Sequence, residues 1–298
     1  MATTGLTDKQ LEQYRRDGYL VASKFFGSEI LTHIDHRIRQ ITDDALASDD
    51  YSSILEVEPD TVAGQVVPRR IHWPYDLHDD FKNLATDRRL LACVESLIGA
   101  NFNLQHSKLN MKPPGVGSVV EWHQDLAYFP HTNDDLVTVL VYLDDATEAN
   151  GCLRVLPRNH THFFDHATPD GRFAGMITED LESGQFGKPV SLEAPAGSVI
   201  FMHCITPHSS HPNRSDKPRR TLIYEYRASD ALPIYYGEMA QIAETKNRPI
   251  RGKRARFARF GGPAPYIPNV VSRYGSLYQL QEDTRAVLAK SAKQGQTR

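Results

Sequence analysis

The spacing of apolar residues changes at residue 101 and divides the chain into a helical part and a β part. Before this point apolar residues recur every three or four positions, most clearly in a row of isoleucines at Ile30, Ile34, Ile38 and Ile41. Such a row forms the buried face of an amphipathic helix. We predict that this helix has Ser28 as its N-cap, and that two further helices begin at the capping residues Thr7 and Asp87.

From residue 101 onward the pattern is that of short strands separated by turns. Residues 136–143 are almost all Val and Leu, which indicates a strand buried on both faces, and Asn150-Gly151 is a hairpin-type turn. Many short strands after a helical start predict a mainly β protein of the α+β type. We expect a cupin-like jelly roll with the N-terminal helices packed against one sheet.

We expect one domain over the whole chain, because no stretch of the sequence reads as a linker. Its parts are a helix-rich N-terminal part (1–100), a β core (101–230), and a C-terminal flap and helix (231–298). The final helix is predicted over residues 273–289.

Three peripheral segments have open interpretations. Residues 48–69 are polar and contain Pro and Gly, which predicts an irregular segment that is either mobile or a lid. Tyr235 and Tyr236 follow the last core strand and are candidates for the mouth of a substrate pocket. The basic run 246–259 is either a solvated face or a flap that presents cations to an anionic substrate.

Composition narrows the class of protein. The chain has 298 residues, of which 40% are hydrophobic and 24% charged, as in an ordinary soluble globular domain. The net charge of −3 has both signs interspersed, so we expect no nucleic-acid partner; no apolar run approaches the ~20 residues of a membrane span. Cys93, Cys152 and Cys204 are odd in number and scattered, which fits a reducing, cytoplasmic environment.

Candidate chemistry is concentrated in the motif His123-Gln124-Asp125, which lies between two strand-like runs. On an extended chain residues i and i+2 point to the same face, so His123 and Asp125 project side by side. One imidazole and one carboxylate are two of the three ligands of a 2-His-1-carboxylate facial triad, although an exposed surface pair would have the same spacing. His203, His208 and His211 compete for the third position. We expect His203 to orient a ligand and His211 to be exposed.

Arg219 opens the strand that follows His208. A metal with three protein ligands retains open positions for an oxo-acid and for dioxygen. A guanidinium then binds the far carboxylate of the oxo-acid through two parallel hydrogen bonds. Because neighbours on a strand point to opposite faces, we expect Arg219 to face inward and Arg220 to face solvent.

In order and spacing these motifs resemble the phytanoyl-CoA dioxygenase (PhyH) family of Fe(II)/2-oxoglutarate oxygenases. The resemblance covers most of the chain, and the stretches that carry it are Asp17-Gly18-Tyr19-Leu20-Val21, Lys112-Pro113-Pro114, His123-Gln124-Asp125, Asn150-Gly151-Cys152-Leu153-Arg154-Val155-Leu156-Pro157 with His160, and the segment from His208 to Arg219. It implies a double-stranded β-helix.

The resemblance also implies a ligand set and a reaction. His123, Asp125 and His208 would hold Fe(II), and the cofactors would be 2-oxoglutarate as cosubstrate and O2. The expected activity is a dioxygenase that hydroxylates an unactivated carbon of a small molecule, releasing succinate and CO2; an anionic substrate is slightly favoured by the basic run. Because Asp125 occupies the position that a halide would need, a halogenase is disfavoured.

For the cosubstrate, the resemblance implies that Arg219 and Ser210 bind the distal carboxylate of 2-oxoglutarate. His106 matches a family position near 2-oxoglutarate, although a lone His on a strand is as often a core residue. Val141 stands where a better-known family member has an aromatic residue against the cosubstrate. The sequence therefore does not predict which residue forms this wall of the pocket.

Two other classes of function remain on the sequence alone. A cupin-like hydrolase or isomerase could use the same His/Asp/His set with another divalent metal, without need of Arg219 or oxygen. A non-catalytic binding protein would be expected to lack a ligand, and none is missing here. The family that the sequence resembles acts on acyl-CoA thioesters, amino acids, phosphonates and secondary metabolites, and the sequence does not select among these substrates. It does not predict the oligomeric state either.

Overall fold

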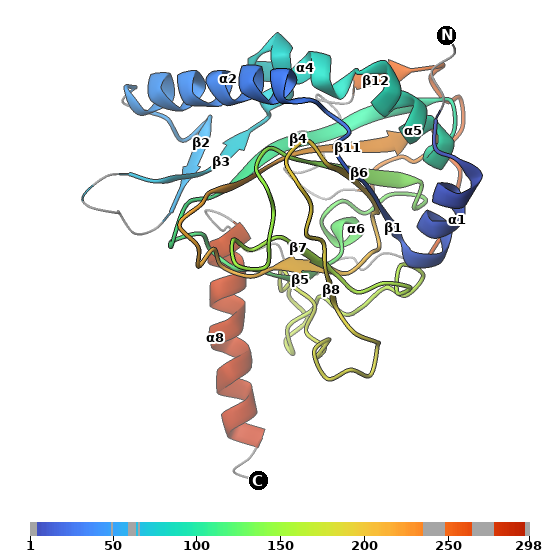
Figure 1. Cartoon of the computed structure of the whole chain (residues 1–298). Helices are drawn as coiled ribbons and strands as arrows, with labels where there is room; N and C mark the ends of the chain where they lie inside the picture. The colour runs from blue at the N-terminus through green and yellow to red at the C-terminus, as the bar shows by residue number, and fades with distance from the viewer. Residues whose placement is uncertain are drawn as a thin grey trace.

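The computed structural model describes residues 5–48, 50–58, 64, 66–234, 248–263 and 277–295. Helices cover one face of a large β-sheet, and a smaller sheet faces the other side (Figure 1). The helices are α1 (Asp8–Asp17), α2 (Ser28–Leu46), α3 (Pro74–Leu77), α4 (Asp79–Ala85), α5 (Arg88–Ile98), α6 (Asp125–Tyr128) and α8 (Leu277–Gly295).

The strands form two antiparallel sheets. They are β1 (Tyr19–Ala22), β2 (Leu55–Val57), β3 (Pro68–His72), β4 (Phe102–Lys112), β5 (Val120–His123), β6 (Leu136–Tyr142), β7 (Leu153–Val155), β8 (Val190–Ser191), β9 (Val199–His203), β10 (His208–Ser210), β11 (Arg219–Ala228) and β12 (Arg248–Arg251). The large sheet has the order β1-β9-β6-β11-β4-β3-β2, with β12 also paired to β4, and the small sheet has the order β5-β10-β7-β8. This confirms the predicted jelly roll with N-terminal helices against one sheet.

The large sheet has an apolar core on each face. On its outer face, Val139 and Leu222 pack with Ile34 of α2 and Phe81 of α4. Its inner face contributes the second core, which includes Leu140, Ile200 and Ile223, between the sheets. All seven residues of β6 are buried, because successive side chains enter different cores, and this explains the unbroken Val/Leu run.

The helix starts agree with the capping signals, with one exception. Thr7 caps α1 in a complete capping box, and the Asp87 side chain accepts hydrogen bonds from the backbone N–H groups of Arg89 and Leu90 at the start of α5. The prediction for Ser28 was wrong by one residue. Gly27 is the N-cap of α2, and Ser28 is its first helical residue.

The prediction that residues 48–69 are irregular throughout was also wrong. The segment contains β2 and the start of β3, which pair with each other and extend the large sheet beyond β4. Arg69 and Glu56 form an ion pair between these strands, with 2.6 Å between Nη2 and Oε1. A polar edge strand of this kind lacks the apolar alternation by which strands are recognised in a sequence.

The C-terminal part is described only in pieces. Tyr235, Tyr236, Lys246 and residues 273–276 lie outside the described residues; α8 agrees with the predicted final helix from Leu277 onward. Within the basic run, Arg251 pairs with Glu95 at 3.0 Å and Arg259 with Asp230 at 3.0 Å.

None of the described residues of the basic run 246–259 lines the cavity of the candidate metal centre.

Within the described part, no helix has the length and apolar character needed to cross a membrane. Cys93, Cys152 and Cys204 are all buried free thiols.

Candidate metal centre

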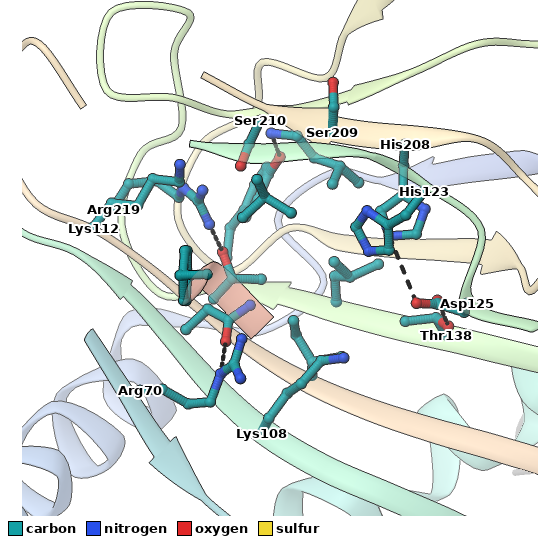
Figure 2. Close-up of a pocket in the computed structure, with 18 residues that line it drawn as sticks. Arg70, Lys108, Lys112, His123, Asp125, Thr138, His208, Ser209, Ser210 and Arg219 are labelled. Carbon is teal, nitrogen blue, oxygen red and sulfur yellow. Dashed lines mark hydrogen bonds and ion pairs between the residues drawn. The ribbon is translucent and has the colours of Figure 1, made fainter. Parts of the chain in front are cut away.

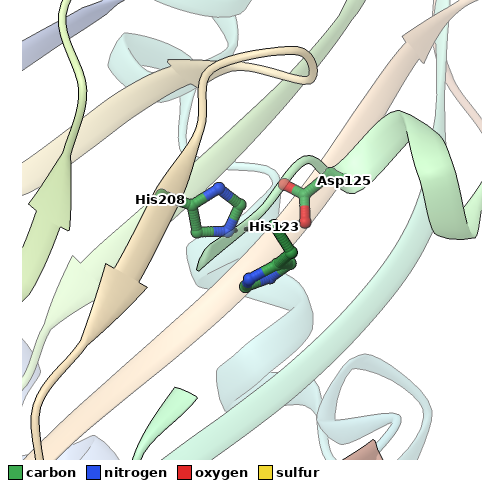
Figure 3. Close-up of side chains that lie close together, drawn as sticks. All are labelled: His123, Asp125 and His208. Atoms are coloured by element: carbon green, nitrogen blue, oxygen red, sulfur yellow. Dashed lines mark ion pairs between the residues drawn. The ribbon is translucent and has the colours of Figure 1, made fainter. Parts of the chain in front are cut away.

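His123, Asp125 and His208 converge at one point between the two sheets (Figure 3). His123 ends β5 and Asp125 opens α6, while His208 begins β10 and lies directly opposite His123 in the antiparallel ladder. All three side chains are buried, and one ligand atom of each lies within 4.8 Å of the other two. The Nε2 atom of His208 is 3.7 Å from Oδ1 of Asp125. The structure therefore brings together the three residues that the sequence singled out.

Backbone carbonyls fix the tautomer of both histidines. Nδ1 of His123 lies 2.8 Å from the carbonyl oxygen of Glu121, and Nδ1 of His208 lies 3.0 Å from that of Thr206. Because a carbonyl can only accept, each Nδ1 carries the proton and the Nε2 lone pair is free. Burial lowers the pKa of both imidazoles, and His208 lowers that of His123 further. Two neutral imidazoles with free Nε2 atoms are what a metal site requires.

The carboxylate is held by a hydroxyl from the large sheet. Oγ1 of Thr138 on β6 donates to Oδ2 of Asp125 at 2.6 Å, which leaves Oδ1 facing His208. Burial raises the pKa of Asp125, but His208, Lys108, His123 and the hydrogen bond from Thr138 together outweigh it and bring the pKa below its usual value. The carboxyl group is therefore ionised and oriented at neutral pH.

Gln124 separates the first two candidate ligands and fixes the loop between them. Its side-chain amide donates to the carbonyl oxygens of His162 and Ile205, and its Oε1 accepts from the backbone N–H of Phe164. These three bonds are made in a fully buried position. The change from strand to helix at Gln124 is thus a rigid feature, which keeps His123 and Asp125 at a fixed separation.

A cavity extends from the triad along the inner face of the large sheet (Figure 2). The triad lies on one side of it and Arg219 and Lys112 lie on the other. Its lining residues are Arg70, Lys108, Asn110, Lys112, Val120, His123, Asp125, Thr138, Leu140, Tyr142, Leu153, His208, Ser209, Ser210, Arg219, Thr221, Ile223 and Tyr278. Four of these described residues are cationic, whereas Asp125 alone is acidic.

The far end of this cavity fits a carboxylate. Arg219 is buried, and its hydrogen-bond partners among the described residues are uncharged: the carbonyl oxygen of Gly151 at 3.0 Å and Oγ1 of Thr221 at 2.8 Å. Lys112 is buried beside it, and its Nζ donates to backbone carbonyls, including that of His211 at 2.6 Å. Burial lowers the pKa of both groups. Two buried cations with neutral partners are stabilised by an anion that enters the cavity.

The other residues that the sequence singled out lie in different places. Ser210 is buried in the cavity lining, whereas His106 is outside it, with its ring 4.3 Å from that of Trp73. His203 contacts Asp134, with 3.9 Å between Nε2 and Oδ2, and its described partners do not include the triad. His211 is exposed, as expected.

Two expectations are corrected by the strand geometry. Arg220 does not face open solvent: its guanidinium binds Asp144 at 2.7 Å and also pairs with Asp35 of α2. Val141 points into the outer core under the helices and so cannot form a wall of the cavity. The aromatic residue in that wall is its neighbour Tyr142, which accepts a hydrogen bond from the backbone N–H of Leu153 at 3.0 Å.

Sequence analysis missed several residues of the site. Thr138 was recognisable as the one polar residue of an otherwise apolar strand. Lys108 shares the cavity face of β4 with Asn110 and Lys112, so the period of two from Lys112 could have found it. Tyr278 had no such signal, because its position depends on how a distant helix packs.

The chain is similar to a known protein family and to several named enzymes. The family model for phytanoyl-CoA dioxygenase (PhyH) matches residues 14–221. The chain is 30% identical over 295 residues to a probable alpha-ketoglutarate-dependent hypophosphite dioxygenase of Stutzerimonas stutzeri, covering 95% of this chain and 98% of that protein. It is 27% identical over 266 residues to the methylphosphonate hydroxylase of Gimesia maris, covering 87% and 97%.

A third relative is the ectoine dioxygenase of Bordetella parapertussis. The two chains are 28% identical over 255 residues, which cover 78% of this chain and 79% of that protein. Among solved structures, the crystal structure of EctD from S. alaskensis with bound Fe has a TM-score of 0.65 at 23% identity, covering 89% of this chain and 88% of that one. At this identity the structural likeness establishes the fold.

Proposed function

Because the chain belongs to the phytanoyl-CoA dioxygenase (PhyH) family, we propose that it oxidises a small phosphorus oxyanion, a phosphinate or phosphonate, with O2 and 2-oxoglutarate. The enzyme class itself is that of its relatives, an Fe(II)- and 2-oxoglutarate-dependent dioxygenase. The relatives are named as dioxygenases and hydroxylases, which leaves the metal-hydrolase alternative without support.

In this proposal His123, Asp125 and His208 hold the iron. The fit rests on the donor set: two imidazoles with free Nε2 atoms and one oriented carboxylate, all buried and within reach of one ion. Bound Fe(II) supplies the oxidising chemistry, in which O2 and 2-oxoglutarate are converted to succinate and CO2 while the substrate gains an oxygen atom. The surrounding protein excludes bulk water and keeps the ligands in place.

Arg219 and Ser210 are proposed to bind the distal carboxylate of 2-oxoglutarate. The guanidinium has a fork of donors that matches a carboxylate, and the buried Ser210 hydroxyl lines the same end of the cavity. Thr221 and Gly151 orient the guanidinium by accepting two of its N–H groups. Lys112 adds a second positive charge at the end that would receive the dicarboxylate.

The observation that favours an anionic substrate is the excess of cations in the cavity. Arg219 and Lys112 are proposed to serve the cosubstrate, which leaves Lys108 and Arg70 for another ligand. Each of these two is anchored by a glutamate: Lys108 Nζ lies 3.0 Å from Glu225, and Arg70 Nη1 lies 3.2 Å from Glu56. Cations fixed in this way present their remaining N–H groups to the cavity, where they can bind a compact oxyanion.

The test is a substrate screen on reconstituted enzyme. Purified protein with Fe(II) and 2-oxoglutarate is given hypophosphite, methylphosphonate or 2-aminoethylphosphonate, and in parallel ectoine or L-proline, and succinate release is measured. We expect a phosphorus oxyanion to stimulate succinate release strongly over the substrate-free rate. Stimulation by ectoine or proline alone would disprove the proposed substrate class while leaving the enzyme class intact.

A control separates the metal site from the substrate site. Asp125→Ala removes the carboxylate ligand and should abolish both iron retention and substrate-stimulated succinate release. Lys108→Ala should retain iron and the slow, substrate-free turnover of 2-oxoglutarate, but lose stimulation by the oxyanion. A Lys108→Ala enzyme that is stimulated like the wild type would show that this cation does not bind substrate.

A further inference from the structure

The helix α8 brings one side chain, Tyr278, into the cavity. Apart from Asp125 at the start of α6, every other described lining residue belongs to a strand of the two sheets. In Figure 1 α8 begins near the two sheets and then projects away from the body of the protein. Its first turn is therefore the part that contacts the site.

The Tyr278 ring lies against two arginines. The guanidinium carbon of Arg69 lies 4.0 Å from the ring centroid and that of Arg70 lies 5.5 Å from it. Arg69 is itself held by two carboxylates, because it forms an ion pair with Glu56 at 2.6 Å and lies 3.6 Å from Glu58. The ring thus lies against arginines that are held by Glu56 of β2 and by Glu58, which follows that strand.

Further contacts hold the start of α8 against the rest of the protein. Nε2 of Gln281 donates to the carbonyl oxygen of Gly175 at 2.8 Å, and its Oε1 accepts from the backbone N–H of Glu121. Oγ1 of Thr284 donates to the carbonyl oxygen of Ala174 at 2.7 Å, in a buried position. Leu280 packs so closely that a Cβ atom at Gly175 would lie 2.6 Å from its Cδ2. These contacts span the first two turns and explain why Tyr278 has a defined position.

Tyr278 lies at the Arg219 side of the cavity. Tyr278, Tyr142 and Arg219 line the same cavity. Burial lowers the pKa of Arg219, and Tyr142 and Tyr278 are the first two of the neighbours that oppose this shift. Asn110 and Thr221 are paired in register across β4 and β11, and both line the cavity beside Arg219.

We propose that Tyr278 is a positioning residue for 2-oxoglutarate: its ring closes the open side of the cavity beside Arg219, so that the cosubstrate is held between the sheet floor and the phenol. This inference rests on the proposed binding of 2-oxoglutarate at Arg219. The family model ends at residue 221, so the closing residue lies outside the part of the chain that the model matches. An aromatic wall excludes water from the ion pair between guanidinium and carboxylate and thereby strengthens it.

The experiment is an anaerobic titration of Fe(II)-loaded protein with 2-oxoglutarate, followed by the visible charge-transfer absorbance of the chelate. Tyr278→Ala opens the wall and should raise the Kd for 2-oxoglutarate about tenfold or more, because an aromatic contact and the exclusion of water are both lost. Tyr278→Phe retains the ring and should stay within about threefold of the wild type. Asp283→Asn, an exposed change on the same helix, should bind like the wild type.

Steady-state kinetics provide a readout that a merely structural role would not move. In Tyr278→Ala the KM for 2-oxoglutarate should rise while kcat at saturating 2-oxoglutarate stays close to wild type. If Tyr278→Ala does not fold, Tyr278→Leu is titrated in its place and should still show a raised Kd. An unchanged Kd in a folded Ala or Leu variant overturns the inference. Failure of the wild type to bind 2-oxoglutarate instead overturns the proposed use of the cavity.

Discussion

At the scale of single residues, the three triad side chains are held in place by hydrogen bonds that exist before a metal binds. The carbonyls of Glu121 and Thr206 engage Nδ1 of the two histidines, and Thr138 engages one oxygen of Asp125. These bonds remove the choices of tautomer and rotamer that each side chain would otherwise lose on binding a metal. The donor set is therefore pre-organised, which predicts that its supporting residues matter nearly as much as the ligands.

Thr138→Val tests this support without touching a ligand. Valine has nearly the same shape but cannot donate to Asp125, so the carboxylate loses its only described hydroxyl partner. We expect the affinity for Fe(II) to fall about 10- to 100-fold, the usual effect of removing such an outer partner. Anaerobic Fe(II) titration measures this, with thermal unfolding of the metal-free protein as a control for folding. An iron affinity equal to the wild type would contradict the proposed role of Thr138.

Arg219→Lys tests the cosubstrate end. The substitution keeps the positive charge but loses the planar fork, and it cannot reach Gly151 and Thr221 in the same way. We expect the KM for 2-oxoglutarate to rise about tenfold or more, since at least one charge-assisted hydrogen bond is lost. Succinate release at increasing 2-oxoglutarate provides the measurement. Because the metal site is intact, saturating cosubstrate should restore much of the activity.

At the scale of elements, the sequence predicted what depends on local spacing. The isoleucine row predicted α2, the Val/Leu run predicted β6, and the capping residues predicted α1 and α5 within a residue or so. His123 and Asp125 were predictable because they are two residues apart on an extended segment, whereas His208 was selected from His203, His208 and His211 by the family resemblance. The strands β2 and β3 were missed, since a polar edge strand is defined by its pairing with β4 and not by its own pattern.

The ion pairs of Arg220, which the sequence did not predict, stabilise the contact between two elements. Its guanidinium joins Asp144, next to β6, to Asp35 of α2, and so connects a helix to the sheet that it covers. Arg220→Ala would leave two partly buried carboxylates close together without their shared cation. We expect a loss of about 1–3 kcal/mol in the free energy of unfolding, measured by urea denaturation. Arg39→Ala removes an exposed cation that pairs with the same Asp35 and should cost about 0.5 kcal/mol or less.

At the scale of the whole molecule, one sheet serves two purposes. Its outer face packs against α2, α4 and α5, where Tyr224 and Tyr226 donate to the carbonyl oxygens of Phe81 and Ala85, each at 2.6 Å. Its inner face carries the cavity and four cations. The helical layer stabilises the fold from outside. On the inner face, Arg219 and Lys112 are buried with neutral partners among the described residues, which is unfavourable until a ligand neutralises them.

This division predicts that ligands stabilise the protein through the inner face alone. Fe(II) and 2-oxoglutarate together, without oxygen, should raise the unfolding midpoint, because a ligand at a hundredfold excess over its Kd adds about 2.7 kcal/mol to stability. For a chain of this size we expect a shift of about 5 °C in a thermal melt. Arg219→Ala should be at least as stable as the wild type without ligands, since it removes an unneutralised buried cation, and should show little additional shift when 2-oxoglutarate joins the iron. A variant with the full wild-type shift would mean that the cosubstrate carboxylate binds elsewhere in the cavity, with Lys112 as the next candidate partner.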